Sequence, residues 1–394
     1  MPTSKADLKF LRADQIGGLA APLFLTELFE RHDRAEIGDD ELFTAQDSAI
    51  GAAIRRQEEI GFPIVSDGEF RRRNFQESFS LAVSGFDVPE TAKYDMQHGR
   101  ISDAPMVRAE QDFAAPGPAI FTRRPTVERL RFVRNVPLEE YRFAARVAAV
   151  APVKVTLLSP DRISQRFDYE HSRGVYKDID EFLADVVAIE RQMIAGLIYA
   201  GCRYIQIDAP GYTAYVDPVS LERMRARGED PDANLARSIA ADNAVIEGFG
   251  GVTFGLHVCR GNPRTIDPAT GKVVAQWHRE GHYDAIAERL FAGLNHDRLL
   301  LEYDSERAGD FAPLRFVPRD KVAVLGLVTT KNPDLEPLDA LRRRIDDAAR
   351  YLPLENLALS PQCGFGGPNR NVMAEEDQWR KLERILETVR AVWG

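Results

Sequence analysis

The chain has 394 residues, of which 44% are hydrophobic and 28% charged. This ordinary globular composition excludes a wholly disordered chain, a collagen-like repeat and a membrane protein. Lys and Arg number 51 against 61 Asp and Glu, for a net charge of -10, so nucleic acid is not expected as a partner, because phosphate binding needs clustered basic residues. The longest apolar run, residues 143–158, is broken by Arg146 and Lys154, so no membrane partner is expected either.

Three cysteines, Cys202, Cys259 and Cys363, are too few for a disulfide framework in a chain of this length. The N-terminal residues carry Lys, Asp and Arg and lack the apolar stretch of a secretory signal. We therefore expect a cytoplasmic protein with free thiols. Cys202 directly precedes a predicted strand and is expected to be a small buried hydrophobe.

Short apolar runs alternate with amphipathic stretches along the chain, which is typical of βα units. Strands are predicted over Gln15–Gly18, Ile64–Asp67, Val153–Leu158, Tyr204–Asp208, Val252–Val258, Leu299–Tyr303, Val322–Val328 and Leu357–Ser360. Helices are predicted over Asp40–Ile60, Ile179–Ala200, Leu235–Gly248, Tyr283–Leu294, Pro337–Arg350 and Glu375–Val392. Eight strands, most of them followed by a helix, predict an α/β fold, a (β/α)8 TIM barrel with insertions over its C-terminal face. A doubly wound open sheet is the alternative.

Residues 70–137 fit no simple βα unit, because they combine Arg71-Arg72-Arg73 with several prolines and short alternating runs. We expect this segment to be an insertion that covers one end of the barrel, and the three arginines to form a solvated face. No internal repeat or low-complexity tract separates parts of the chain. Residues 1–394 are therefore predicted to form one domain.

Functional side chains collect at the predicted carboxyl ends of the strands, where a (β/α)8 barrel carries its active site. They are Asp67, Glu69, Ser159, Asp208, His257, Cys259, Glu302, Asp304 and Cys363. His257 and Cys259 are two residues apart on one strand, so their side chains point to the same face. Glu302 ends an otherwise apolar strand, where a buried carboxylate needs a metal or another cation.

An imidazole, two thiolates and a carboxylate form a suitable tetrahedral set for Zn²⁺. We predict that His257, Cys259, Cys363 and Glu302 hold a catalytic zinc ion, because these residues come from three strands and not from a local knuckle; a structural zinc, or none, is the alternative. A thiolate-rich zinc site binds an incoming thiol well, so the predicted chemistry is alkyl transfer to sulfur. Glu302 is the ligand expected to give way to the substrate sulfur.

These residues resemble the cobalamin-independent methionine synthase family, specifically its C-terminal catalytic barrel. The matching stretches are Val65-Ser66-Asp67-Gly68-Glu69, Tyr204-Ile205-Gln206-Ile207-Asp208, His257-Val258-Cys259, Leu301-Glu302 and Pro361-Gln362-Cys363-Gly364. The resemblance implies a zinc barrel with the four ligands named above. It also implies that Glu69 and Asp208 hold the amino group of homocysteine. Asp67 and Ser159 are further substrate-binding candidates because of their place at strand ends. Simple ion pairs with neighbouring Arg residues are the alternative for Glu69 and Asp208.

The chain departs from the family pattern at both substrate sites. Asp208-Ala209-Pro210 stands where the family has Asp-Glu-Pro. The family's Gly-Ser-Phe-Pro turn, which engages the amino acid carboxylate, is replaced by residues 17–22, which begin Gly17-Gly18. The tryptophan that stacks on the folate pterin has no equivalent near Leu157-Leu158-Ser159-Pro160.

We therefore expect a zinc-dependent methyltransferase acting on a small-molecule thiol, with a methyl donor such as methyltetrahydrofolate. The family's default reaction moves the methyl group of 5-methyltetrahydropteroyltri-L-glutamate to homocysteine. Glu302 is the predicted catalytic ligand, and Asp304 or His282 the predicted general acid for the departing donor nitrogen. Two alternatives stay open: an alkyl transferase with another thiol or donor, as in epoxide:coenzyme M transferases or O-demethylases, and a zinc-binding barrel without turnover.

Overall fold

The computed structural model describes residues 8–87, 94–95, 100–101, 125–165, 167–261, 264–266, 273–275, 279–366 and 373–394. Its centre is a six-stranded sheet in the order β12-β11-β10-β7-β6-β5. The strands are β5 (Lys154–Leu158), β6 (Tyr204–Asp208), β7 (Thr253–Val258), β10 (Arg298–Glu302), β11 (Val322–Val328) and β12 (Leu357–Pro361), and all their residues are buried. All neighbouring strands run parallel and follow one another along the chain, as βα units require.

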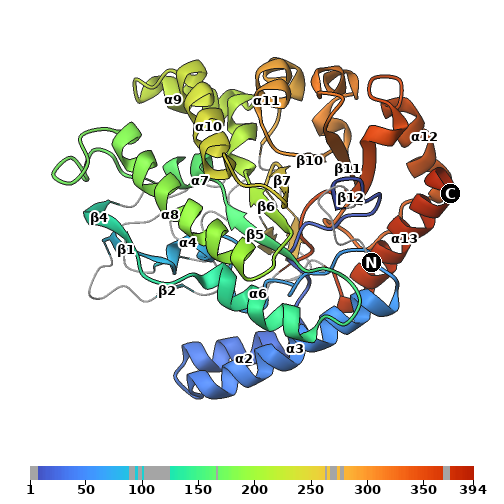
Figure 1. The fold of residues 1–394 in the computed structure, drawn as a ribbon, viewed down its shortest axis with the longest axis horizontal. Coiled ribbons are helices and arrows are strands. Elements are labelled where there is room, and N and C mark those ends of the chain that lie inside the picture. Colours follow the sequence, from blue (N-terminus) through green and yellow to red (C-terminus); the bar gives the residue numbers. More distant parts are fainter. Residues whose placement is uncertain are drawn as a thin grey trace.

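Two further segments close the sheet into a barrel. Ala13 forms a parallel bridge with Leu359 of β12, and Val65 forms one with Val153, just before β5. Ser66 Oγ donates to the carbonyl of Gly17 at 2.7 Å and so joins the two segments to each other. The fold is the expected α/β class, a (β/α)8 barrel (Figure 1).

The first two barrel positions are irregular and do not form the regular strands predicted over Gln15–Gly18 and Ile64–Asp67. Side-chain amides replace part of the strand ladder there. Gln57 accepts from the N–H of Ser66 at 3.0 Å and donates to its carbonyl at 2.8 Å, while Gln15 accepts from the N–H of Gly17 at 3.0 Å. Since these backbone groups bond to side chains, they are satisfied without a regular ladder.

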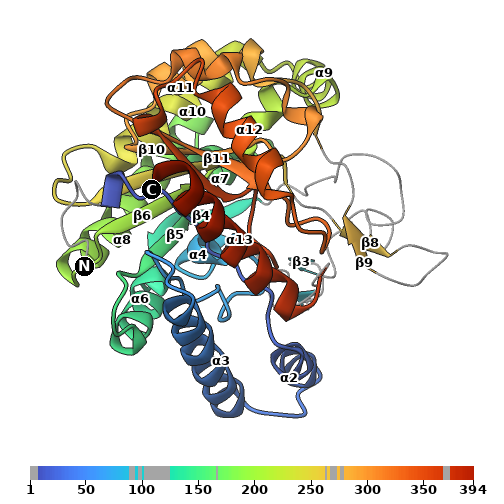
Figure 2. The same ribbon diagram turned by 90° about the vertical axis from the view of Figure 1, so that its right-hand side faces the viewer.

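Helices cover the outside of the barrel (Figures 1 and 2). They are α2 (Leu23–Asp33), α3 (Asp39–Glu59), α4 (Glu77–Ser80), α6 (Val136–Val147), α7 (Pro160–Gln165), α8 (Ile179–Tyr199), α9 (Pro218–Ala226), α10 (Pro231–Ile246), α11 (Ala287–Gly293), α12 (Leu338–Ala348) and α13 (Glu375–Trp393). Short 3-10 helices are η1 (Pro210–Tyr215), η2 (Tyr283–Ala285), η3 (Glu306–Ala308), η4 (Ala312–Phe316) and η5 (Leu354–Asn356). Within the described part of the chain, no helix combines the length and the apolar character needed to cross a membrane.

All six predicted helices are confirmed, as α3, α8, α10, α11, α12 and α13. Five helices were not predicted individually, namely α2, α4, α6, α7 and α9, although α6 and α9 carry start signals. Asn135 accepts from the N–H of Leu138 at the start of α6, and Asp217 accepts from the N–H of Ser220 at the start of α9. Both helices also have proline in the first turn, which favours a helix start.

Short antiparallel pairs occupy the predicted insertion and the loop after β7. β1 (Val83–Phe86) pairs with β4 (Thr126–Phe132), and β2 (Tyr94–Asp95) pairs with β3 (Arg100–Ile101). The rest of residues 88–124 lies outside the described residues. β8 (Arg264–Ile266) and β9 (Val273–Ala275) form a hairpin that projects from the body of the molecule in Figure 2. The one-domain organisation and the covering role of residues 70–137 stay predictions.

A buried carboxylate, Asp14, joins the amino ends of three strands. Its Oδ1 lies 2.8 Å from Nζ of Lys154, the first residue of β5, and its Oδ2 lies 3.0 Å from the guanidinium of Arg298, the first residue of β10. The hydroxyl of Tyr204, the first residue of β6, also donates to Oδ2. All four residues are at most 2% exposed. Both buried cations therefore contact Asp14, and the backbone carbonyls of Gln15 and Leu11 accept further hydrogen bonds from them.

Replacing Asp14 by Asn should destabilise the protein strongly, because two buried cations would lose their counter-charge. We expect the free energy of unfolding to fall by about 3–5 kcal/mol, measured by urea denaturation. Asp347→Asn, in a solvent-exposed pair with Arg350, is the matched control and should change stability far less. Equal stability of Asp14→Asn and wild type would show that the contacts of Asp14 with Lys154 and Arg298 do not stabilise the barrel.

Candidate active site

Three metal-ligating side chains meet at the carboxyl ends of the strands. His257 and Cys259 come from the end of β7, and Cys363 follows β12, which is separated from β7 in the sheet by β10 and β11. One nitrogen of His257 and the two sulfurs all lie within 4.8 Å of one another. We call these three residues the His-Cys-Cys cluster. Among the described residues, no other three or more His, Cys, Asp or Glu side chains come together in this way.

The charges around the His-Cys-Cys cluster favour a bound cation. Asp208 Oδ1 lies 3.2 Å from Nδ1 of His257 and accepts from the amide of Gln206 at 2.6 Å. Burial by itself would lower the pKa of His257, but Cys259 and Asp208 raise it to about 10. A hydrogen bond from Cys363, opposed by burial and assisted by His257, holds the pKa of the Cys259 thiol well below its usual value. The cluster therefore stabilises positive charge placed within it.

Glu302 lies at the end of β10, near enough to the cluster to act electrostatically on Cys259. Its Oε1 accepts from Lys331 Nζ at 3.2 Å and from the guanidinium of Arg307, and its Oε2 accepts from the backbone N–H of Arg260 at 2.8 Å. Burial would raise the pKa of Glu302, but Lys331 and Arg307 hold it below its ordinary value. The cations that this buried carboxylate requires are thus supplied by the chain itself.

The two predicted general acids have different surroundings. Asp304 Oδ2 accepts from Lys331 at 2.7 Å, and its buried Oδ1 has no hydrogen-bond partner. Lys331 therefore joins Asp304 to Glu302. His282 is exposed and packs against Gly309, where an added Cβ would lie 2.8 Å from the imidazole ring. The general-acid role of either residue stays a prediction.

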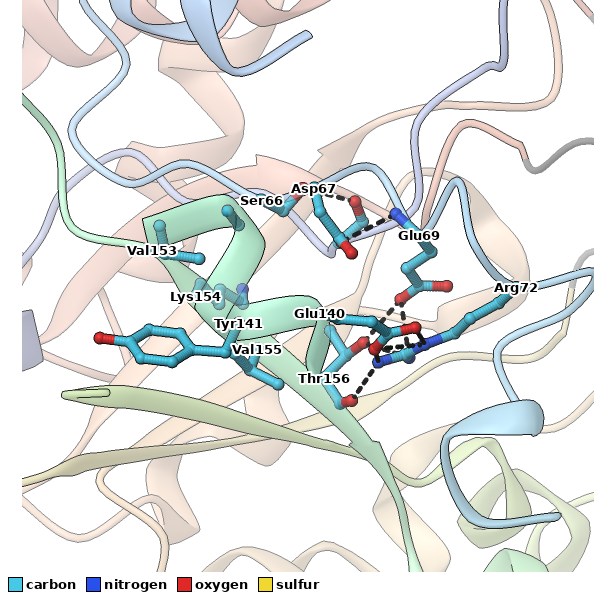
Figure 3. Close-up of a pocket in the computed structure, with 12 residues that line it drawn as sticks. Ser66, Asp67, Glu69, Arg72, Glu140, Tyr141, Val153, Lys154, Val155 and Thr156 are labelled. Carbon is cyan, nitrogen blue, oxygen red and sulfur yellow. Dashed lines mark hydrogen bonds and ion pairs between the residues drawn. The ribbon is translucent and has the colours of Figure 1, made fainter. Parts of the chain in front are cut away.

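Glu69 lies above a buried network that Figure 3 shows in close-up. Thr156 Oγ1 donates to Glu69 Oε1 at 2.7 Å and accepts from Nη1 of Arg72 at 2.8 Å. Arg72 binds Glu140 through contacts of 2.6 and 2.9 Å, and its Nη1 stays 3.7 Å from Glu69. Burial raises the pKa of Glu69 to about 7; Arg72 opposes this shift and Asp208 adds to it. Arg72 therefore neutralises Glu69 only in part.

The backbone holds Glu69 in a conformation that is rare for a residue with a side chain. Its φ is +58°, and its N–H donates to Asp67 Oδ1 at 2.9 Å. Gly17 packs directly against it, because an added Cβ there would lie 2.9 Å from Glu69 Oε1. Strain of this kind costs on the order of 1–3 kcal/mol and is common at functional positions. The absence of a side chain at Gly17 thus leaves room for the Glu69 carboxylate.

The other two predicted substrate residues are buried. Asp67 and Glu69 line a small cavity with room for about one water molecule, and Asp67 Oδ2 has no hydrogen-bond partner there (Figure 3). Ser159 is fully buried, donates to Asp242 at 2.8 Å and accepts from the N–H of Asp161 at 3.0 Å. The hydroxyl of Ser159 is therefore used within the protein. A substrate contact for Asp67 or Ser159 stays a prediction.

One interpretation of the basic cluster is wrong. Arg72 is 3% exposed and does not belong to a solvated face, because Glu140 of α6 compensates its charge in the interior. Nothing in the sequence points to this pair, since its members are 68 residues apart. Arg71 and Arg73 do pair with acids nearer the surface.

Arg307 and Lys331 were not predicted as site residues. Lys331 could have been found, because it follows the apolar strand β11 at the same rim where Glu302 ends β10. The interpretation of Cys202 is confirmed: its side chain is fully buried, and its thiol donates to the carbonyl of Tyr204 at 3.4 Å.

Comparisons with known proteins agree with this architecture. The uncharacterized protein YxjH of Bacillus subtilis is 33% identical over 387 residues, which cover 97% of this chain and 94% of YxjH. A methionine synthase of Pyrococcus abyssi is 24% identical over 386 residues, covering 98% of this chain and 94% of the relative. The crystal structure of a putative vitamin-B12 independent methionine synthase from Listeria monocytogenes matches with a TM-score of 0.71 at 23% identity and covers 98% of both chains. No family model matches the chain. The chain belongs to the cobalamin-independent methionine synthase family.

Replacing Glu69 by Gln should change how stability depends on pH. The folded protein keeps a proton on Glu69 up to a pKa of about 7, above the ordinary value of 4.5. Wild type should therefore lose stability relative to Glu69→Gln as the pH rises from 4.5 through 7. The difference should reach on the order of 2–3 kcal/mol, measured by urea denaturation across this range. Glu59→Gln, at the exposed end of α3, is the control for the change of charge itself. A difference that is constant with pH would contradict the expected pKa of Glu69.

Proposed function

We propose that this protein is a zinc-dependent methyltransferase that transfers a methyl group to the sulfur of a small thiol. The observation that carries the proposal is the His-Cys-Cys cluster, whose three donor atoms lie within 4.8 Å of one another at the barrel rim. One borderline nitrogen and two soft sulfurs are donors that zinc prefers, whereas Mg²⁺ and Ca²⁺ prefer oxygen. Relatives named methionine synthase support a methyl transfer reaction.

The residues of the cluster would hold the zinc ion. When bound, zinc supplies a Lewis acid that lowers the pKa of the acceptor thiol and keeps its sulfur nucleophilic near neutral pH. Asp208 and Gln206 fix the orientation of the His257 ring. Burial of His257 and Cys259 excludes bulk water from this part of the site, so charges there act strongly.

Glu69 and Asp208 are proposed to bind the amino group of the acceptor. Asp208 contributes to the raised pKa of Glu69, so the two carboxylates repel each other, and an ammonium group between them would relieve the repulsion. Gly17 keeps the space beside Glu69 free of a side chain. This arrangement favours a thiol that carries an ammonium group, such as homocysteine, over one that does not.

We therefore propose a methionine synthase-like reaction from 5-methyltetrahydropteroyltri-L-glutamate to homocysteine. The carbon–nitrogen bond of the donor breaks, a carbon–sulfur bond forms, and the proton of the thiol must finally reach the donor nitrogen. Asp304 is favoured over His282 for handling this proton, because Asp304 Oδ1 is buried without a hydrogen-bond partner whereas His282 is exposed.

Metal analysis of the purified protein should show about one zinc ion per chain. Cys259→Ser and Cys363→Ser should lose most of this zinc, because each removes one sulfur of the cluster. Cys202→Ala is the matched control; it removes a buried thiol outside the cluster and should keep the zinc. A normally folded wild type without zinc affinity would refute the proposed function.

Methyl transfer assays with a panel of thiols test the acceptor. Wild type should methylate homocysteine, and Glu69→Gln should raise the KM for homocysteine by about tenfold or more, because a charge-assisted hydrogen bond is lost. The KM for the same thiol acid without the amino group should change little. An equal effect on both thiols would contradict the ammonium contact, and transfer only to another thiol such as coenzyme M would favour the alternative alkyl transferase.

A further inference from the structure

A fully buried arginine next to the His-Cys-Cys cluster has no partner for its side chain. Arg260 follows Cys259 in the chain, and its backbone N–H donates to Glu302 Oε2 at 2.8 Å. The Arg260 side chain is 0% exposed, yet none of its three guanidinium nitrogens has a hydrogen-bond partner in the described part of the chain. A buried charge without a partner is costly, so this guanidinium requires an acceptor.

A second unpartnered donor lies close to Arg260. Arg260 Cζ is 5.1 Å from the ring centroid of Tyr283, and the Tyr283 ring lies 5.4 Å from the ring of Tyr303. The Tyr303 hydroxyl is buried without a hydrogen-bond partner among the described residues, and the charge of Arg260 acts on it. Guanidinium nitrogens only donate, and a tyrosine hydroxyl can donate as well. One acceptor could therefore satisfy both side chains.

Positive charge exceeds negative charge in this part of the interior. Glu302 and Asp304 have side chains that are only 1% and 3% exposed, and both contact Lys331. Glu302 also contacts Arg307. Arg260 acts electrostatically on Glu302 as a third cation, but its guanidinium forms no ion pair with a described residue. Three cations thus face two buried carboxylates.

The other charged groups near the Tyr303 hydroxyl lie closer to the surface. Asp284 and Asp310 are exposed, so water screens their charges from the interior. Arg344 of α12 is half-buried and interacts electrostatically with Tyr303, which adds a second guanidinium on this side. These groups do not remove the excess of positive charge around Arg260.

We propose that the guanidinium of Arg260 and the hydroxyl of Tyr303 form a binding site for one small oxyanion, a carboxylate or a phosphate group. The planar guanidinium fork matches two oxygens of such a group. The oxyanion would supply a negative charge that the buried carboxylates at this rim, already bound to other cations, do not. A free inorganic ion and the anionic end of a substrate share this chemistry. The inference goes beyond the proposed methyl transfer and uses none of the side chains of the His-Cys-Cys cluster.

Isothermal titration calorimetry of the full-length protein with inorganic phosphate and with acetate tests the site. Wild type should bind one of these ions at a single site per chain. Arg260→Gln should weaken this binding by about tenfold or more, because the charged fork is lost, and Arg260→Lys, which keeps the charge, should weaken it less. Tyr303→Phe removes only the hydroxyl and should weaken binding by about threefold.

Urea denaturation at constant ionic strength gives a second readout. Phosphate should raise the urea midpoint of wild type but not that of Arg260→Gln, because only a protein that binds the ion is stabilised by it. Arg350→Gln is the matched control, because Arg350 pairs with Asp347 at the surface. This variant should bind phosphate and acetate like wild type.

Two results would overturn the site: no binding of phosphate or acetate by wild type, or equal binding by wild type and Arg260→Gln. If Arg260→Gln does not fold, equal binding by wild type, Arg260→Lys and Tyr303→Phe overturns it in the same way.

Competition identifies the source of the oxyanion. Weaker phosphate binding in the presence of saturating homocysteine or methyltetrahydrofolate would show that the site takes the carboxylate of that substrate, whereas unchanged binding would assign it to a free ion. Both results require that the anion site exists. Anion binding is measured without metal and without turnover, so a wild type that lacks zinc affinity would overturn the proposed function and leave this site in place.

Discussion

The closure of the barrel depends on one buried carboxylate at its amino end. Asp14 contacts the first residues of β5, β6 and β10, and its segment bridges β12, so these strands are fixed relative to one another at this end. Both buried cations depend on the one carboxylate of Asp14, so a slipped strand would separate a buried cation from its only side-chain counter-charge in this cluster. The register that results sets Asp208 opposite His257 at the other end. The geometry of the rim is thus decided partly by a contact on the opposite side of the barrel.

The same requirement that buried charges be paired also determines the contacts of the glutamates at the carboxyl ends of the strands. Glu69 and Glu302 each contact a cation that is shared with a second carboxylate. The shared pairs are Arg72 with Glu140 and Lys331 with Asp304. Sharing holds each glutamate in place. Arg72 leaves the charge of Glu69 only partly neutralised, whereas Glu302 also contacts Arg307 and the backbone N–H of Arg260.

The elements of the fold were largely predictable from periodicity. Six of the eight predicted strands are regular strands of the sheet. They could be predicted because strands such as Val322–Val328 are buried on both faces and therefore form continuous apolar runs in the sequence. The other two positions are irregular, because the amides of Gln15 and Gln57 take over backbone hydrogen bonds. The bridge at Val65 lies within the predicted range, whereas the bridge at Ala13 lies just before the predicted Gln15–Gly18. Helices α6 and α9 were missed, although a capping residue and a proline in the first turn mark the start of each.

The sequence by itself determined the barrel and the identity of the residues at its rim, because strand ends in a parallel sheet share one edge and few polar residues stand there. Proximity within the site was decided only by the tertiary structure. It brings His257, Cys259 and Cys363 together, places Glu302 between Arg307 and Lys331, and directs Arg72 to Glu140. The local sequence pattern around a residue carries no information about these ion-pair and ligand partners, because residues far apart in sequence meet only after the barrel closes. The free-energy cost of burying an unpaired charge then selects which of these residues pair.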